Sequence, residues 1–413
     1  MSIKTDLIIY NLSEIVSLPQ VVRGFAKEKD LGIIYDGFIA IKDGKIFYVG
    51  ERKDLYKFDA SLKIDAENSI AIPGLIDPHT HLIYAGARED EYEMILSGAE
   101  YDEILSRGGG IIRTMRETSK TSLDILVKET VKRIYEFVKS GVTTIEIKTG
   151  YGIDIDSELK LVRALEMVRR DVEIDVIPTL LAHVIPPGFE RKEFIDRFVS
   201  TLIPEAVKKD FLFIDVFCDS GAFNVDESRK ILSNGVSAGL KARIHADELA
   251  YIKCSDLGLE LGSVSIDHLN NTPREVLEKI AKSDIVAILS PTTSIYIAKK
   301  MPDVYTLLRN NGIIALTTDH SPALMNLDMI ETMNLASIYF SLPPANIIAA
   351  TTVNAAYSLR AEKIGSIKEG FQADLVILNV KSYRYIGYLR KRDLIKYVIK
   401  RGRILYRSSN QKL

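Results

Sequence analysis

The chain has 413 residues, of which 46% are hydrophobic and 27% charged, and its formal net charge is −2. This composition is typical of a folded globular protein; it excludes a disordered chain and gives no sign of nucleic-acid binding. No stretch approaches the roughly 20 apolar residues that span a bilayer, and the amino terminus lacks the pattern of a signal peptide, so we expect a cytoplasmic protein that binds no membrane.

Short β-rich runs separated by turns occupy both ends of the chain. Residues 6–72 contain no long amphipathic helix, and Asp43-Gly44 has the dipeptide signature of a two-residue β-hairpin. The stretch 363–413 has the same character. We predict a composite β-sandwich domain formed by residues 1–72 and 363–413, with two unrelated β extensions as the alternative.

The middle of the chain, residues 73–362, alternates apolar strand candidates with helices. The clearest helix, 122–140, places apolar side chains at i, i+3 and i+4 spacing. The strand candidates are 72–82, 142–150, 173–183, 211–219, 240–248, 263–269, 284–292 and 313–321. Because these apolar strands suit burial on both faces and alternate with helices, we predict a (β/α)8 TIM barrel.

All six histidines lie at the carboxyl end of a strand candidate. They are His79, His81, His183, His245, His268 and His320. In a (β/α)8 barrel the carboxyl ends of the strands meet at one face, where the active site lies. Histidines that are distant in sequence are therefore expected to be neighbours.

The positions of these histidines first indicate a metal-binding site. His79 and His81 are separated by one residue on a strand, so both side chains point the same way and can bind one ion. His245 and Asp319 would complete a set that suits one Zn2+ or Fe2+/Fe3+ ion with a position left open for water. Such an ion lowers the pKa of water toward neutrality, which indicates hydrolysis.

Two further residues are candidates for catalysis. Glu248 lies three residues after His245, close enough to carry protons without being a ligand; capping of the next helix is the alternative. His268 can polarise the scissile carbonyl or orient the water, with a buried structural histidine as the alternative. His320 directly follows Asp319 and should face away from the metal, so we leave it out of the site.

The residues around the histidines form extended sequence blocks. The blocks are PGLIDPHTHL (73–82), HLIYAGAREDEYEMILSGAEYDEILSRGGGI (81–111), IKTGYG (147–152), LLAHVIPP (180–187), HADE (245–248) and IGSIKEGFQADLVIL (364–378). Together they resemble, nearly end to end, the imidazolonepropionase family of the amidohydrolase superfamily. The first and last blocks are shared by many amidohydrolases, whereas the block 81–111 is more specific.

The resemblance implies hydrolysis of 4-imidazolone-5-propanoate to N-formimidoyl-L-glutamate, a step of histidine degradation. By motif position, it implies metal ligands at His79, His81, His245 and Asp319, and substrate contacts from Arg88, Tyr151, His183 and Glu248. Arg88 offers a forked cation for the substrate carboxylate, and Tyr151 and His183 can hydrogen-bond the ring nitrogens or the carboxylate. A plain salt bridge for Arg88 and simple packing for Tyr151 are the alternatives.

The mechanism that we expect uses metal-activated water to attack the ring carbonyl, with His268 stabilising the oxygen. Asp319 and Glu248 would pass a proton to the departing ring nitrogen. Many amidohydrolases bridge two metals with a lysine on strand four, but the fourth strand candidate contains no lysine, and Lys148 ends the second instead. We therefore expect one metal ion per chain.

The sequence departs from the family pattern after Asp319. The family has an aromatic residue, Asn-Pro-Gly and a hydroxyl residue there, whereas this chain has His320, Ser321, Pro322, Ala323 and Leu324. Ser321 can still donate one hydrogen bond to substrate, but Ala323 lacks the backbone freedom of glycine. A related cyclic amide or amidine therefore stays open as the substrate.

Two other functions compete with this one. A deaminase or cyclic amidase of the same superfamily would share the metal ligands but not the carboxylate contact of Arg88. A catalytically silent scaffold is the second, although all proposed ligands are present. The partner that we expect is a small anionic heterocycle, and the resemblance makes a homodimer plausible.

Cys218 and Cys254 are the two cysteines of the chain. Two are too few for a disulfide framework, and their spacing is not that of a zinc site formed by cysteine pairs. We predict that both are buried or incidental.

Overall fold

Eight parallel strands form a barrel-like sheet in the middle of the chain. The computed structural model describes residues 2–99, 108–390 and 393–409. The strands are β5 (Leu75–Asp77), β6 (Val142–Lys148), β7 (Asp175–Ala182), β8 (Phe213–Cys218), β9 (Lys241–Ala246), β10 (Ser265–His268), β11 (Val286–Leu289) and β12 (Ile313–Leu316). Each pairs with the next along the chain. The predicted barrel is confirmed, since every strand candidate contains one of these strands.

The two ends of this sheet are joined just beyond β5 and β12. The backbone N–H of His81 donates to the carbonyl of His320 over 2.8 Å. The hydroxyl of Thr317 donates to the carbonyl of His79 over 2.6 Å. These bonds hold the segments that follow the first and last strands side by side, so histidines and acids from both ends of the barrel become neighbours.

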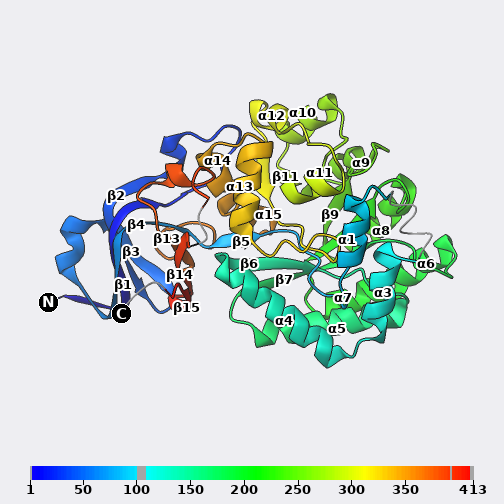
Figure 1. The fold of residues 1–413 in the computed structure, drawn as a ribbon, viewed down its shortest axis with the longest axis horizontal. Coiled ribbons are helices and arrows are strands. Elements are labelled where there is room, and N and C mark those ends of the chain that lie inside the picture. The colour runs from blue at the N-terminus through cyan, green and yellow to red at the C-terminus, as the bar shows by residue number, and fades with distance from the viewer. Residues whose placement is uncertain (1, 100–107, 391–392, 410–413) are drawn as a thin grey trace.

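Helices cover the outside of the barrel (Figure 1). They are α1 (Glu89–Leu96), α3 (Gly110–Lys120), α4 (Leu123–Lys139), α5 (Ile155–Asp171), α6 (Arg191–Arg197), α7 (Ile203–Lys208), α8 (Val225–Ser237), α9 (Cys254–Glu260), α10 (Arg274–Lys282), α11 (Pro291–Tyr296), α12 (Val304–Arg309), α13 (Met329–Tyr339), α14 (Pro344–Ala350) and α15 (Val353–Ser358). The predicted helix 122–140 is α4, which buries Leu126, Ile134 and Val138 against the barrel. No helix among the described residues is long and apolar enough to cross a membrane.

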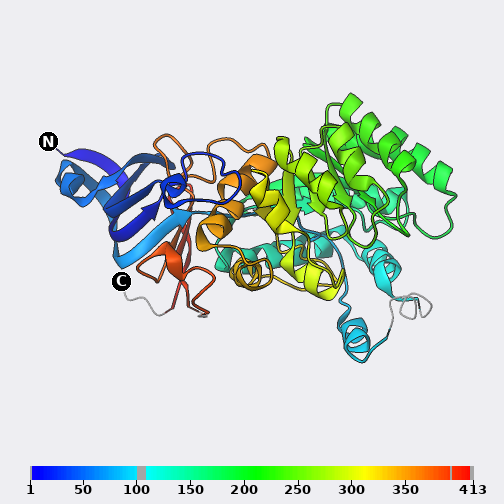
Figure 2. The same ribbon diagram turned by 90° about the horizontal axis from the view of Figure 1, so that it is seen from above.

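Both ends of the chain contribute to a second sheet. Its strands are β1 (Ile3–Val16), β2 (Ile33–Lys42), β3 (Lys45–Glu51), β4 (Phe58–Pro73), β13 (Leu375–Leu378), β14 (Ile395–Lys400) and β15 (Arg403–Arg407), in the order β15-β14-β13-β4-β1-β2-β3. The turn between β2 and β3 has φ of 52° at Asp43 and 71° at Gly44, as the predicted hairpin requires. The N–H of Ala373 donates to the carbonyl of Gly44, so the sheet curls around one apolar core. Figure 2 shows this sheet at one end of the molecule and the barrel at the other.

The prediction for the cysteines is wrong in one respect. Cys218 and Cys254 are both fully buried, as expected, but they are not incidental, because they form a disulfide across 36 positions of sequence. Their spacing gave no signal, since only the barrel brings the end of β8 next to the start of α9. In the chain-entropy model, a disulfide that closes a loop of this length stabilises a fold by about 4 kcal/mol.

A buried ion pair fastens the second sheet to the barrel. The Nζ atom of Lys400, at the end of β14, lies 2.8 Å from Asp374 and 2.6 Å from Asp175, the first residue of β7. The side chain of Lys400 is only 2% exposed. Removing this cation would leave the buried carboxylate of Asp374 without a cation, whereas Asp175 would keep its pair with Arg401.

We therefore predict that Lys400→Met lowers the free energy of unfolding by about 3 kcal/mol, because breaking a buried ion pair leaves uncompensated charge. Urea denaturation measures this. The matched control is Lys139→Met, which removes an exposed pair with Glu136 and should leave stability almost unchanged. Equal stability of the two variants would contradict the role of Lys400.

Candidate metal centre and active site

Four side chains with metal-ligand atoms meet at the carboxyl face of the barrel. His79 and His81 follow β5, His245 lies on β9 and Asp319 follows β12. The Nε2 atom of His81 is 3.3 Å from Nε2 of His79 and 3.4 Å from Nε2 of His245. The Oδ1 atom of Asp319 is 3.4 Å from Nε2 of His79 and 3.5 Å from Nε2 of His81. The fold thus brings together the whole set that the sequence suggested.

The distances from His81 to His79 and His245, and from Asp319 to His79 and His81, suit side chains that share a metal ion. Two overlapping groups could hold one, His79 with His81 and Asp319, and His79 with His245 and His268. A tetrahedral zinc site with bonds of about 2.0–2.1 Å places its ligand atoms about 3.3–3.4 Å apart. These residues are almost fully buried. Lone pairs that face one another at such distances in a buried space repel unless a cation lies among them.

Buried carboxylates fix which nitrogen of two histidines faces the centre. Oδ2 of Asp267 lies 2.6 Å from Nδ1 of His79, and Oδ1 of Asp215 lies 3.1 Å from Nδ1 of His245. Each carboxylate can accept the Nδ1 proton, which leaves the Nε2 lone pair available to a metal. His81 is oriented by stacking instead, with its ring centroid 5.1 Å from that of His183.

Two buried cations balance these carboxylates. The Nζ atom of Lys148 is 2.8 Å from Asp215, and Nη2 of Arg243 is 3.4 Å from Asp267. Burial raises the pKa of Asp215, but His245 and Lys148 outweigh it and hold that pKa well below its usual range. The carboxylate of Asp215 is therefore ionised and able to accept the proton of the histidine.

The sequence-based reasoning missed this supporting layer. The sequence gives Lys148 only as an argument against a second metal, and it assigns no role to Asp215, Arg243 or Asp267. The available signal was a charged residue inside an otherwise apolar strand: Arg243 lies two positions before His245, so both side chains point into the barrel. Asp267, which directly precedes His268, carried no comparable pattern.

Two residues of the site have a left-handed backbone. Asp319 has φ of 52° and His268 has φ of 77°. Residues with a Cβ atom adopt such conformations at a cost on the order of 1–3 kcal/mol, so the surroundings must hold them there. At Asp319, the hydroxyl of Thr293 on α11 donates a hydrogen bond to Oδ2, which leaves Oδ1 turned toward the histidines.

Glu248 and His268 lie beside the four ligands. Nε2 of His268 is 3.7 Å from Oε2 of Glu248, and Nδ1 of His268 is 4.0 Å from Oδ2 of Asp319. A nitrogen of His268 also lies within 4.8 Å of ligand atoms of His79 and His245. Burial, and then the charge of Asp319, raise the pKa of Glu248 well above its usual range. Such a carboxyl group can hold a proton and release it during a reaction.

The other substrate-binding candidates fall into two groups. The ring of Tyr151 lies 5.3 Å from that of His183 and 6.2 Å from that of His81, so both candidates line the space next to the ligands. Arg88 precedes α1, and its Nε donates to Glu91 over 2.6 Å. Residues 100–107 of the block 81–111 lie outside the described residues.

The segment after Asp319 forms a tight turn. The N–H of Ser321 donates to the carbonyl of Leu324 over 3.1 Å, and the reverse bond measures 3.0 Å. His320 points away from the ligands, as expected, and its Nε2 lies 3.0 Å from the hydroxyl of Tyr84. The altered loop is thus a folded turn, in which Ser321 is half-buried.

Comparison with known proteins finds both a family model and solved structures that are similar to this chain. A family model described as "Amidohydrolase family" matches residues 254–405. The fold is similar to that of an adenosine deaminase from Xanthomonas campestris with bound zinc, at a TM-score of 0.74 and 16% identity over 98% of this chain and 93% of that one. It is also similar to guanine deaminase from E. coli, at a TM-score of 0.74 and 16% identity over 97% and 99% of the two chains. The solved structures show the fold, and the family model indicates an amidohydrolase over the residues that it matches.

Closer relatives specify the family. A protein of Pyrobaculum arsenaticum named imidazolonepropionase is 43% identical over 90% of this chain and 93% of its own length. Another of that name, from Kosmotoga olearia, is 38% identical over 98% of this chain and 100% of its own length. The chain belongs to the imidazolonepropionase family.

The geometry of the carboxylates yields a prediction about metal binding. In Asp267→Asn the partner of His79 loses its charge, so the affinity for zinc should fall about 10- to 100-fold while the fold is kept. Competition with a chelator measures the dissociation constant. Asp374→Asn, which removes a similarly buried carboxylate where the second sheet meets the barrel, should leave it unchanged. Equal affinities in all three proteins would refute the role of Asp267.

Proposed function

We propose that this chain hydrolyses the ring C–N bond of 4-imidazolone-5-propanoate and releases N-formimidoyl-L-glutamate. The observation that supports this most strongly is the set of three histidines and one aspartate, with Glu248 and His268 beside it. Membership of the imidazolonepropionase family supports the choice of substrate.

One metal ion per chain, Zn2+ or Fe2+/Fe3+, would be held by His79, His81, His245 and Asp319. A bound ion of this kind activates water and polarises a carbonyl group. A single ion is favoured because β8 carries no lysine, and Lys148 is already engaged by Glu146 and Asp215 at 2.8 Å each. No lysine is left in these two strands to bridge a second metal.

The chain's own side chains would carry the protons. Asp319 accepts a proton from the attacking water, and Glu248 delivers a proton to the departing ring nitrogen. His268 donates a hydrogen bond to the carbonyl oxygen as negative charge develops there. The 3.7 Å between Glu248 and His268 is consistent with both groups reaching one bound ring.

Substrate recognition would come from Arg88, Tyr151, His183 and Ser321. The guanidinium of Arg88, held by Glu91, pairs with the propanoate carboxylate. Tyr151 and His183 bind the ring or the carboxylate from beside the ligands, and Ser321 donates one hydrogen bond from the turn after Asp319. The charge of Arg88 distinguishes this substrate from the neutral rings of purine and pyrimidine deaminase substrates.

The proposed reaction predicts loss of the ultraviolet absorbance of freshly generated 4-imidazolone-5-propanoate, with N-formimidoyl-L-glutamate identified by mass. A panel of neutral cyclic amides, guanine, cytosine and adenosine should react far more slowly. Turnover of a neutral ring, with no product from the imidazolone above its spontaneous background, would favour the deaminase or cyclic amidase instead.

Glu248→Gln tests the proton path. Because the amide cannot exchange a proton in the same way, kcat should fall at least tenfold, within the range of about 10² to 10⁴ for lost acid–base catalysis. KM and zinc content should change little, since Glu248 is not among the four ligands. Unchanged turnover would remove Glu248 from the mechanism.

A further inference from the structure

Glu248 is held on a loop that has little packing of its own. The loop 247–253 joins the end of β9 to Cys254, the first residue of α9, and has no regular structure. Its outer side chains reach the solvent: Leu249 is 46% exposed and Tyr251 is 36% exposed. Glu248 itself is only 7% exposed and turns inward. Contacts from neighbouring segments must therefore fix its position.

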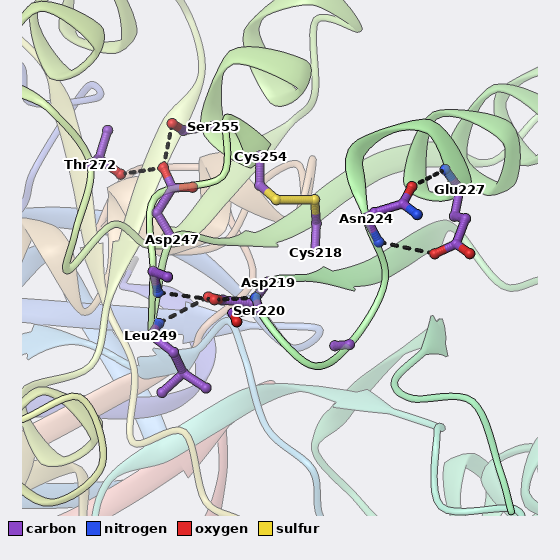
Figure 3. Close-up of a disulfide and its surroundings, with 12 residues drawn as sticks. Cys218, Asp219, Ser220, Asn224, Glu227, Asp247, Leu249, Cys254, Ser255 and Thr272 are labelled. Atoms are coloured by element: carbon purple, nitrogen blue, oxygen red, sulfur yellow. Dashed lines mark hydrogen bonds between the residues drawn. A yellow bond between two sulfur atoms is a disulfide. The ribbon is translucent and has the colours of Figure 1, made fainter.

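Two consecutive residues at the end of β8 hold this loop at separate points (Figure 3). Cys218, whose register partner on β9 is Ala246, is bonded to Cys254 at the far end of the loop. Asp219 follows, and its carboxylate accepts the backbone N–H groups of Leu249 at 2.9 Å and Ala250 at 3.0 Å. We call the disulfide and the Asp219 carboxylate together the β8 clamp.

The other side of the loop is attached to the segment after β10. Asp247 accepts hydrogen bonds from the hydroxyls of Ser255 and Thr272, at 2.5 and 2.8 Å. The side-chain amide of Asn271 donates to the carbonyl of Glu248 over 2.7 Å. The backbone of Glu248 is thus held between the end of β8 and the segment after β10. Ser255, which bonds Asp247, directly follows Cys254 in sequence, so this second attachment adjoins the disulfide.

We propose that the β8 clamp positions Glu248 for the reaction, so that it controls turnover and not metal binding. The inference rests on the proposed function, in which Glu248 carries the proton to the ring nitrogen. His245 lies on β9 itself, and His79 and Asp319 lie at the joined ends of the barrel, so none of these ligands depends on the loop. Without the clamp, α9 and the loop can move away from β8 while the ligands stay in place.

The kinetic test replaces both cysteines by alanine, in the wild-type chain and in the Glu248→Gln variant. In the wild-type background, Cys218→Ala/Cys254→Ala should lower kcat at least fivefold and change KM and zinc content less than twofold. In the Glu248→Gln background it should cause no further loss, because there is no proton carrier left to position. Val216→Ala, another buried residue of β8, is the control and should keep kcat within twofold.

A second measurement does not depend on activity. Hydrogen exchange at the amides of Leu249 and Ala250 should speed up at least tenfold when the cysteines are replaced, whereas Ile314 on β12 should exchange as before. Asp219→Asn keeps the disulfide and one acceptor oxygen, so it should give a smaller increase. If the double alanine variant does not fold, Asp219→Asn still tests the clamp by the same exchange measurement.

The outcomes separate this inference from the proposed function. If the wild-type chain is inactive, the proposed function is wrong. The exchange measurement then still tests whether the β8 clamp holds the loop. Three results would each overturn the proposed clamp. The first is unchanged exchange at Leu249 and Ala250, and the second is an equal loss of kcat in the wild-type and Glu248→Gln backgrounds. The third is the detection of two free thiols in protein that is denatured without reductant.

Discussion

The structure depends on one electrostatic constraint. Three imidazole nitrogens and one carboxylate oxygen, all from almost fully buried side chains, lie 3.3–3.5 Å from their neighbours. Such an arrangement of lone pairs is unfavourable by itself and becomes favourable around a cation. The barrel supplies the geometry, because its parallel strands bring distant histidines to one face. The bonds that join the segments after β5 and β12 place Asp319 in the same group.

Much of the barrel interior serves this constraint. Charged side chains occupy inward positions on β6, β8, β9 and β10, where apolar ones would cost less. Lys148 and Arg243 lie against Asp215 and Asp267, which in turn hold His245 and His79. Each of these four buried charges therefore has a partner of opposite sign, and the Nε2 atoms of His79 and His245 face the centre in the form that can bind metal. Glu248, the proposed proton carrier, is held separately, on a loop attached to β8 and to the segment after β10.

The sequence was sufficient for the parts of the structure that follow local patterns. Alternation of apolar strands and helices predicted all eight barrel strands, and Asp43-Gly44 predicted the hairpin of the second sheet. The H-x-H pair and the position of histidines at strand ends predicted which side chains would meet at one face of the barrel. These features depend on periodicity and on fold-level rules, which one sequence displays directly.

The remaining features depend on contacts across the barrel. The disulfide joins residues whose spacing has no meaning until β8 and α9 are packed together, and pairing of Asp267 with His79 spans 188 positions. The left-handed backbone at Asp319 and His268 depends on hydrogen bonds and neighbours, because Asp and His adopt it more often than most residues but only at a minority of their positions. Local sequence therefore predicted the ligands better than it predicted what orients them.

The central claim is that one metal ion lies among His79, His81, His245 and Asp319. Anomalous scattering at the zinc absorption edge, from crystals of the zinc-loaded chain, tests it directly. The account predicts one strong peak per chain within bonding distance of the three Nε2 atoms and the Asp319 carboxylate. A peak elsewhere, two equal peaks in the site, or none would contradict it.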